Sequence, residues 1–229
     1  MEWLTKHTEL IFYILLAIAL LLPSFPLIGK YFRSVNTLVH EAGHAFMTLA
    51  LSGEVISVNL FADTSGTTVT KAKNKLSQVL IALAGYPFSV LTAWLFLFFL
   101  EKGQPLNILF ILTSIALIIM VLSLRNTYGL FWAGTFVVFN LLIIYFDNKL
   151  IIYIAAAFYS LTILSDAVIS SLVLLVLSIK QAKKSGDAAN LQKITKIPAA
   201  IWAILILAFT LIIVWITVRN YFPSLNLIT

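Results

Sequence analysis

Apolar runs that are long enough, or nearly long enough, to cross a lipid bilayer account for most of this chain. Hydrophobic residues make up 61% of the 229 residues and charged residues only 10%, with a mean hydropathy of +1.03. A soluble domain carries about 25% charged residues. Because a chain in lipid must satisfy its backbone polar groups internally, the runs are expected to be helices. The pattern predicts an all-α polytopic membrane protein with about six to seven transmembrane or membrane-embedded helices.

The expected spans form one integral membrane domain, residues 1–229. Pro23 and Pro26 interrupt the end of the first span, 9–28, and no small-residue cleavage motif follows it, which favours a retained span over a signal peptide. The second element, 34–52, is barely long enough to cross. The remaining spans are expected at 76–100, 106–124, 130–146, 150–178 and 197–218, with a polar loop at 180–196.

The basic residues, which give a net charge of +6, lie in short loops between the apolar runs. This distribution favours the positive-inside rule and contact with anionic lipid head groups over nucleic-acid binding. If the loop 180–196 is cytoplasmic and every element crosses, the N-terminus is inside and the C-terminus outside. If the short element 34–52 re-enters instead, the N-terminus moves to the other side.

The most specific feature is His-Glu-Ala-Gly-His at 40–44, inside the apolar run 35–51. The pattern H-E-x-x-H places two histidines on one face of a helix, where both can bind one zinc ion. Glu41 then lies beside the metal and can accept a proton from water, as in metal-dependent hydrolases. A histidine in an apolar helix is more often a hydrogen-bonded core residue, but two of the only three histidines stand at this spacing.

The segment 54–70 differs in pattern from the helices around it. β-Prone residues alternate over 54–61 and recur at 67–70, and Asp-Thr-Ser-Gly at 63–66 is typical of a turn. The pattern fits a small interfacial β-hairpin, with an ordinary interfacial loop as the alternative. A sheet edge cannot face lipid. A free edge near the histidines could bind an extended peptide by β-augmentation.

A hydrolytic zinc site requires three protein ligands and one open position, so one ligand must come from outside 40–44. The chain has no cysteine, and His7 precedes the first span at the water interface. Asp166 stands well inside an apolar run, and an intramembrane carboxylate is a candidate functional group. We therefore predict Asp166 as the third ligand. The alternative is that Asp166 caps a helix break or binds a backbone group beside Ser165.

The sequence resembles the site-2 protease family of intramembrane zinc metallopeptidases. The resemblance rests on the motif at 40–44, the β-prone segment 53–70 and Ala-Gly-Tyr-Pro at 84–87. Ser-Asp-Ala at 165–167 completes the match to the compact, bacterial-type branch without a PDZ domain, whereas the Leu-Asp-Gly segment of better-known members is absent. The resemblance covers 34–178, which it implies to be the catalytic core, with 9–28 and 197–218 as flanking spans.

The resemblance implies a zinc-dependent endopeptidase that hydrolyses peptide bonds in or near transmembrane segments of a membrane protein or peptide. The two histidines and Asp166 would hold Zn²⁺, and Glu41 would be the general base for zinc-activated water. Asn126 and Asn140 could line a polar inlet or bind the oxyanion, or they could cap helices and form interhelical hydrogen bonds. The expected location is a multi-pass position in a bacterial-type cell membrane.

Two other functions fit the same residues. One is a membrane zinc hydrolase acting on a lipid or small amide, because a metal site alone does not select the bond that is cut. The other is a non-catalytic membrane protein that binds helices. The intact Glu41 argues against the second alternative, since such a protein has no need of a general base.

Overall fold

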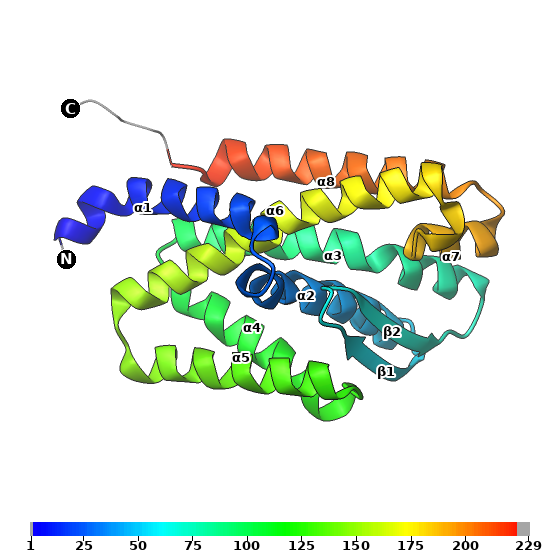
Figure 1. Cartoon of the computed structure of the whole chain (residues 1–229), viewed down its shortest axis with the longest axis horizontal. Coiled ribbons are helices and arrows are strands. Elements are labelled where there is room, and N and C mark those ends of the chain that lie inside the picture. Colours follow the sequence, from blue (N-terminus) through cyan, green and yellow to red (C-terminus); the bar gives the residue numbers. More distant parts are fainter. Residues whose placement is uncertain (1, 224–229) are drawn as a thin grey trace.

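The computed structural model describes residues 2–223, and the side chains of residues 8–223. It confirms the predicted all-α membrane fold with a small antiparallel β-hairpin (Figure 1). The elements in chain order are α1 (Glu2–Leu21), the 3-10 turn η1 (Leu22–Ser24), α2 (Ile28–Ala50), β1 (Glu54–Leu60), β2 (Gly66–Lys71), α3 (Lys75–Glu101), α4 (Pro105–Leu122), α5 (Thr127–Phe146), α6 (Lys149–Lys180), η2 (Ala182–Lys184), α7 (Asp187–Thr195) and α8 (Ala199–Tyr221).

Five helices, α3, α4, α5, α6 and α8, are each long and apolar enough to cross a membrane. Helices α1 and α2 pass that test only as a pair, and they are bent by 102° at the break between them. Pro23 lies in the first turn of η1 at this break, and a proline has no backbone N–H to continue a helix. The described residues therefore contain up to six spans, and α2 begins at Ile28 rather than at residue 34.

The bend places α1 beside the end of α8. The Tyr13 hydroxyl donates a hydrogen bond to the Pro223 carbonyl at 2.5 Å, and the rings of Phe12 and Phe222 pack edge to face with centroids 5.1 Å apart. The prediction that every element crosses by itself needs α1 and α2 to be separate spans, whereas they pass the test for a span only as one bent pair, either a broken span or a re-entrant loop. The side of the membrane on which each chain end lies stays a prediction.

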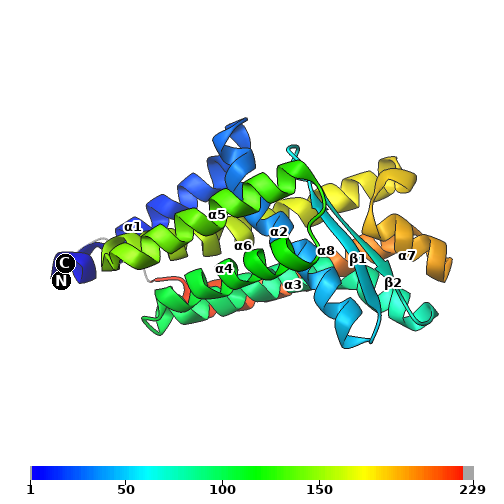
Figure 2. The ribbon, with the colours of Figure 1, turned by 90° about the horizontal axis from the view of Figure 1, so that it is seen from below.

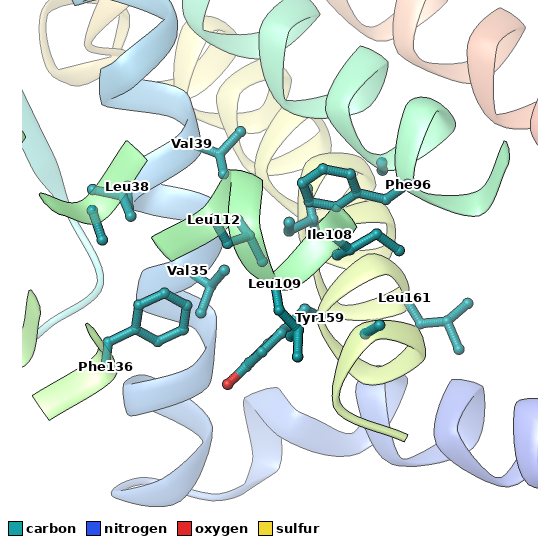
Figure 3. Packing of buried hydrophobic residues seen from close by; sticks show 14 of the residues in the cluster. Val35, Leu38, Val39, Phe96, Ile108, Leu109, Leu112, Phe136, Tyr159 and Leu161 are labelled. Carbon is teal, nitrogen blue, oxygen red and sulfur yellow. The ribbon is translucent and has the colours of Figure 1, made fainter. Parts of the chain in front are cut away.

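Helix α2 lies in the centre of the bundle. One of its faces packs against apolar side chains, and the other carries polar groups. Val35, Leu38, Val39 and Ala42 follow the i, i+3, i+4, i+7 spacing of one helix face, and all four are buried. Figure 3 shows the first three among side chains from α4, α5 and α6. The other face carries the polar residues Arg33, Asn36, Thr37, His40, Glu41 and His44.

The predicted hairpin is confirmed, and the outer edge of β1 is covered by the link between α4 and α5. The Val58 amide donates to the Ser123 carbonyl at 2.8 Å, and the Arg125 amide donates to the Val58 carbonyl at 3.1 Å. The Asn126 side chain accepts from the Leu60 amide at 3.1 Å and donates to the Leu60 carbonyl at 2.5 Å. Within residues 2–223, the outer edge of β2 has no strand partner.

The polar elements gather at one end of the bundle. The segment 180–196, predicted as a polar loop, contains η2 and the short helix α7. Helix α7 packs against α3 and α8 through Ala188 and Leu191. The hairpin lies at the same end as α7 in both views of the ribbon (Figures 1 and 2).

Helix α3 comes close to α2 because glycines stand at their contact. A Cβ atom on Gly43 would lie 2.6 Å from Cβ of Phe88. A Cβ atom on Gly85 would lie 2.5 Å from Nε2 of His40 and 2.6 Å from Nε2 of His44. Contacts this short require the helices or the imidazole rings to move apart, so the packing of α3 on α2 requires glycine at residue 85.

Replacing Gly85 with alanine is expected to destabilise the protein by about 1–3 kcal/mol, because overpacking outweighs the small gain in helix propensity. Gly134→Ala is the matched control, since a Cβ atom on this α5 glycine meets nothing within 4 Å. Thermal unfolding of the purified protein in detergent measures the difference. A Gly85→Ala protein as stable as Gly134→Ala would contradict the prediction.

Candidate metal centre

The two histidines of α2 point their Nε2 atoms toward a common point: these atoms lie 3.1 Å apart, and both lie within 3.3 Å of one carboxylate oxygen. The Nδ1 atom of His44 donates to the Ile81 carbonyl on α3 at 2.7 Å, since a carbonyl oxygen only accepts. This bond orients the ring, and in the neutral imidazole it leaves the Nε2 lone pair free toward the common point. The His40 ring packs edge to face on Tyr86, with centroids 4.7 Å apart.

Asp187, the first residue of α7, completes the group. Its Oδ2 atom lies 3.1 Å from Nε2 of His40 and 3.3 Å from Nε2 of His44. A tetrahedral zinc ion with bonds of about 2.0–2.1 Å has ligand atoms about 3.3 Å apart. The three donor atoms are therefore spaced as one face of a zinc tetrahedron.

The electrostatics of Asp187 suit a metal ligand. Burial by itself would raise the pKa of the Asp187 carboxyl, but without a metal the charge of His44 and hydrogen bonds from both imidazoles hold that pKa well below its usual range. A metal ion would take the place of the Nε2 protons that make these contacts and would supply the positive charge instead. The carboxylate is therefore ionised at neutral pH, which is the form that binds a cation.

The space around the donor atoms also fits a metal ion. Gly85 of α3 faces both Nε2 atoms, and a Cβ atom there would contact them. Two imidazole nitrogens and one carboxylate oxygen form one of the ligand sets of catalytic zinc sites, which leave a fourth position open. The residues present thus fit the zinc ion that the sequence predicts.

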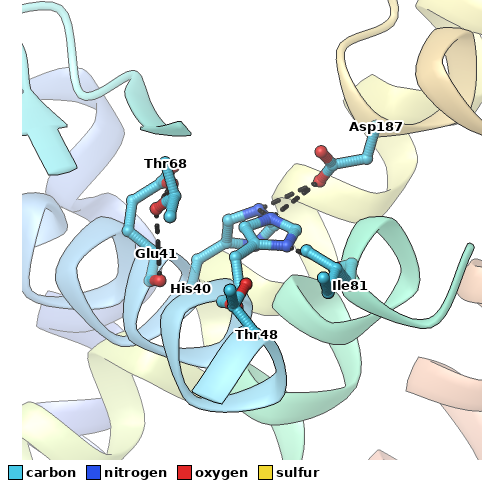
Figure 4. A network of polar contacts seen from close by, with 7 residues as sticks. His40, Glu41, Thr48, Thr68, Ile81 and Asp187 are labelled. Carbon is cyan, nitrogen blue, oxygen red and sulfur yellow. Dashed lines mark hydrogen bonds and ion pairs between the residues drawn. The ribbon is translucent and has the colours of Figure 1, made fainter. Parts of the chain in front are cut away.

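Glu41 lies on the same face of α2, between the imidazoles and the hairpin. Its side chain is buried, and the Thr68 hydroxyl of β2 donates to its Oε2 atom at 2.6 Å (Figure 4). Strand β2 approaches this closely because residue 66 is glycine: a Cβ atom there would lie 2.5 Å from Oε1 of Glu41. The hairpin therefore orients the carboxylate predicted to be the general base.

Asp166, the predicted third ligand, lies elsewhere. Its Oδ1 atom accepts from Nε of Arg33 at 2.6 Å, and its Oδ2 atom accepts from Nδ2 of Asn36 at 3.3 Å. The structure brings Asp187 rather than Asp166 to the two imidazoles. The reason is that α7 folds against α3 beside the histidines, whereas α6 meets α2 at Arg33, about two turns earlier.

The two asparagines predicted for an inlet or oxyanion site do not line the cavity at the metal centre. Asn126 binds both backbone groups of Leu60 and extends the sheet. Asn140 is fully buried in α5, where its Nδ2 atom donates to the Phe136 carbonyl at 2.9 Å. Both side chains thus have structural roles, but not the predicted ones: Asn126 binds a strand instead of capping its helix, and the Asn140 bond lies within α5 instead of between helices.

A cavity of about 720 Å³ opens beside the metal centre. The polar face of α2, strand β2, helix α6 and the start of α7 line it. It extends from Asp187 and the two histidines to the Arg33–Asp166 ion pair. A substrate segment in this cavity would contact Glu41 and the ion pair together.

Asp187 and Thr68 carry little signal in the sequence. Asp187 follows a glycine in a polar loop and precedes Ala-Ala-Asn-Leu, so the only pointer is an acidic residue opening a short helical segment. Thr68 is one of several threonines in a β-prone run. Both roles depend on contacts with α2, and a local sequence pattern does not reveal such contacts.

Comparison with known proteins agrees with this geometry. No curated protein and no solved structure matches the chain. A family model described as Peptidase M50B-like matches residues 11–217 and so includes the first and last spans. The apolar helices, and the cluster of His40, His44 and Asp187 that could hold a metal ion, fit a membrane metallopeptidase. The chain belongs to the Peptidase M50B-like family, which confirms its place among the site-2 proteases.

Proposed function

We propose that this protein is a zinc-dependent endopeptidase that hydrolyses peptide bonds in or near transmembrane segments. The observation that carries the proposal is the group of three donor atoms on His40, His44 and Asp187 beside the buried carboxylate of Glu41. When bound, zinc would supply Lewis-acid activation of a water molecule and of the peptide carbonyl. Asp187 takes the role of third ligand in this proposal.

Glu41 is the general base. Its carboxylate accepts a proton from water as the water oxygen attacks the carbonyl carbon. It then gives that proton to the amine nitrogen as the C–N bond breaks, so that one water molecule is consumed and a carboxylate and an amine leave. Thr68 positions Glu41 for both transfers, because its hydroxyl hydrogen bonds to Oε2.

The hairpin favours a peptide substrate over a lipid or small amide. Strand β2 lines the cavity, and its outer edge has no strand partner within residues 2–223. An extended peptide can add to such an edge through backbone hydrogen bonds. Since Thr68 of the same strand touches Glu41, a peptide paired with β2 has its own peptide bonds next to the general base.

Charge gives the orientation in the membrane. The end of the bundle that holds the metal centre carries most of the basic side chains, which the positive-inside rule places in the cytoplasm. Cleavage would then occur near the cytoplasmic face of a cell membrane. The basic residues at this end include Lys71, Lys73, Lys75, Arg125, Lys180, Lys183, Lys184, Lys193 and Lys196, against Lys102, Lys149 and Arg219 at the other ends of α3, α6 and α8.

Asp187→Asn is expected to lower zinc affinity by at least about tenfold, because the anionic ligand is lost. Loss of a residue that only supports a ligand already lowers metal affinity by about ten- to a hundredfold. Asp166→Asn is the matched control and should retain zinc, since Asp166 pairs with Arg33. Zinc content after dialysis against a graded series of chelator concentrations measures both variants. If Asp166→Asn loses zinc and Asp187→Asn keeps it, Asp166 is the ligand after all.

Glu41→Gln is expected to bind zinc as tightly as the wild type and to cleave transmembrane peptides about 10²–10⁴-fold more slowly, since the amide cannot accept the proton. Cleavage is followed by mass spectrometry of the peptide products in detergent micelles. A zinc-loaded Glu41→Gln protein of undiminished activity would rule out this mechanism.

Thr68→Val is expected to lower kcat about tenfold or more while zinc content is unchanged, because a hydrogen bond to a charged group is lost. Thr68→Ser keeps the hydroxyl and should restore most of the rate. Equal rates for the valine and serine variants would show that the hydroxyl does not position Glu41.

A further inference from the structure

We propose that Arg33, Asn36 and Asp166 form a polar subsite that binds an uncharged amide group of the substrate, a proposal that rests on the peptidase function above. All three residues line the same cavity as the metal centre. Arg33 and Asn36 come from the polar face of α2, and Asp166 comes from the middle of α6. The side-chain hydrogen bonds of Arg33 and Asn36 within residues 8–223 go to Asp166 and not to the three proposed zinc ligands.

The contacts inside the polar subsite leave specific hydrogen-bonding groups unused. Nε of Arg33 and Nδ2 of Asn36 each bind one oxygen of Asp166, at 2.6 and 3.3 Å. The Oδ1 atom of Asn36 is buried and has no hydrogen-bond partner in residues 8–223. The terminal nitrogens of Arg33 likewise have no hydrogen-bond partner in that part of the chain. One acceptor and several donors are therefore available beside the cavity.

A purely structural role explains these residues less well. Replacing a buried ion pair with apolar side chains is often neutral or stabilising, so the pair is not there for stability alone. Ionisable residues at membrane depth typically mark the path of a substrate or ion. A buried acceptor without a partner also carries a free-energy penalty that a ligand N–H would remove. The Asn36 side chain is only 5% exposed, so water alone satisfies its oxygen poorly.

The charges of the polar subsite select the class of ligand. Arg33 and Asp166 cancel, so a carboxylate in the subsite would meet Asp166 and an ammonium group would meet Arg33. An uncharged amide offers what the subsite lacks: its carbonyl accepts from the guanidinium, and its N–H donates to Oδ1 of Asn36. That amide is either the side chain of an Asn or Gln residue or a peptide group freed from helical hydrogen bonds.

The distance along α2 gives the position of the amide in the substrate. Asn36 and Arg33 precede His40 by four and seven residues, which is roughly 6 and 10 Å along the helix axis at about 1.5 Å per residue. An extended peptide advances about 3.3 Å per residue. The bound amide thus lies roughly two to three residues from the bond that is cut.

The test uses zinc-loaded, full-length protein and a set of transmembrane peptides in which Leu is replaced by Asn, one position at a time, within four residues of the cleavage site. The replacement is nearly isosteric and exchanges an apolar side chain for an amide. The loss of hydrophobicity is common to all positions, so only a gain confined to one position reports the polar subsite. The wild type is expected to cleave the Asn peptide with a kcat/KM about ten- to a hundredfold higher at one position, two to three residues from the cut bond. Asn36→Leu should abolish that preference, and the control Asn140→Leu, in α5 away from the cavity, should retain it.

A second variant, Arg33→Lys, retains the positive charge beside Asp166 but removes the guanidinium fork, and it should reduce the same preference.

Zinc content confirms that each variant is folded. If both variants instead lower kcat/KM equally for every peptide, the bound amide is a peptide group, which also supports the polar subsite. A wild type that cleaves all peptides alike, with variants as active as the wild type, overturns the subsite alone. A zinc-loaded wild type that cleaves no peptide overturns the proposed function and the subsite with it.

Discussion

The close contact of α3 with α2 at Gly85 is the constraint on which the rest of the site depends. The absence of a side chain there lets α3 reach the imidazoles, so that the Ile81 carbonyl can orient His44. The same contact leaves open the space between the two Nε2 atoms. On the opposite face of α2, Val35, Leu38 and Val39 are fully buried, which keeps α2 in place behind its polar groups.

Each ionisable side chain among Arg33, His40, Glu41 and His44 on the polar face of α2 has a partner on another element. Glu41 receives a hydrogen bond from β2, Arg33 pairs with α6, and the two histidines meet a carboxylate of α7. Charges removed from water are costly unless they are paired. The hairpin, α6 and α7 therefore converge on α2 because each supplies a partner that the apolar part of the bundle lacks.

The location of the site follows from these partners. Asp187 belongs to the polar segment between α6 and α8, so the metal centre lies near one end of the bundle, where water has access. Asp166 lies in the middle of α6, so the cavity extends from that end toward the apolar interior. A site with one water-accessible end and one buried end suits a substrate segment that leaves the membrane only in part.

The sequence by itself determined the helical membrane fold, the hairpin, the pair of histidines with Glu41, and the family. These features depend on local patterns: apolar run length, strand alternation and the four-residue spacing of one helix face. The tertiary structure alone decided that α1 and α2 form one bent unit, that Asn126 caps a sheet edge, and that Asp187 rather than Asp166 meets the histidines. His40 and Asp187 are 147 residues apart, and only the packing of α7 on α3 brings them together.

Burial in an apolar run made Asp166 the expected ligand, but a nearby arginine on α2 satisfies its charge. No local pattern shows which partner a buried carboxylate finds.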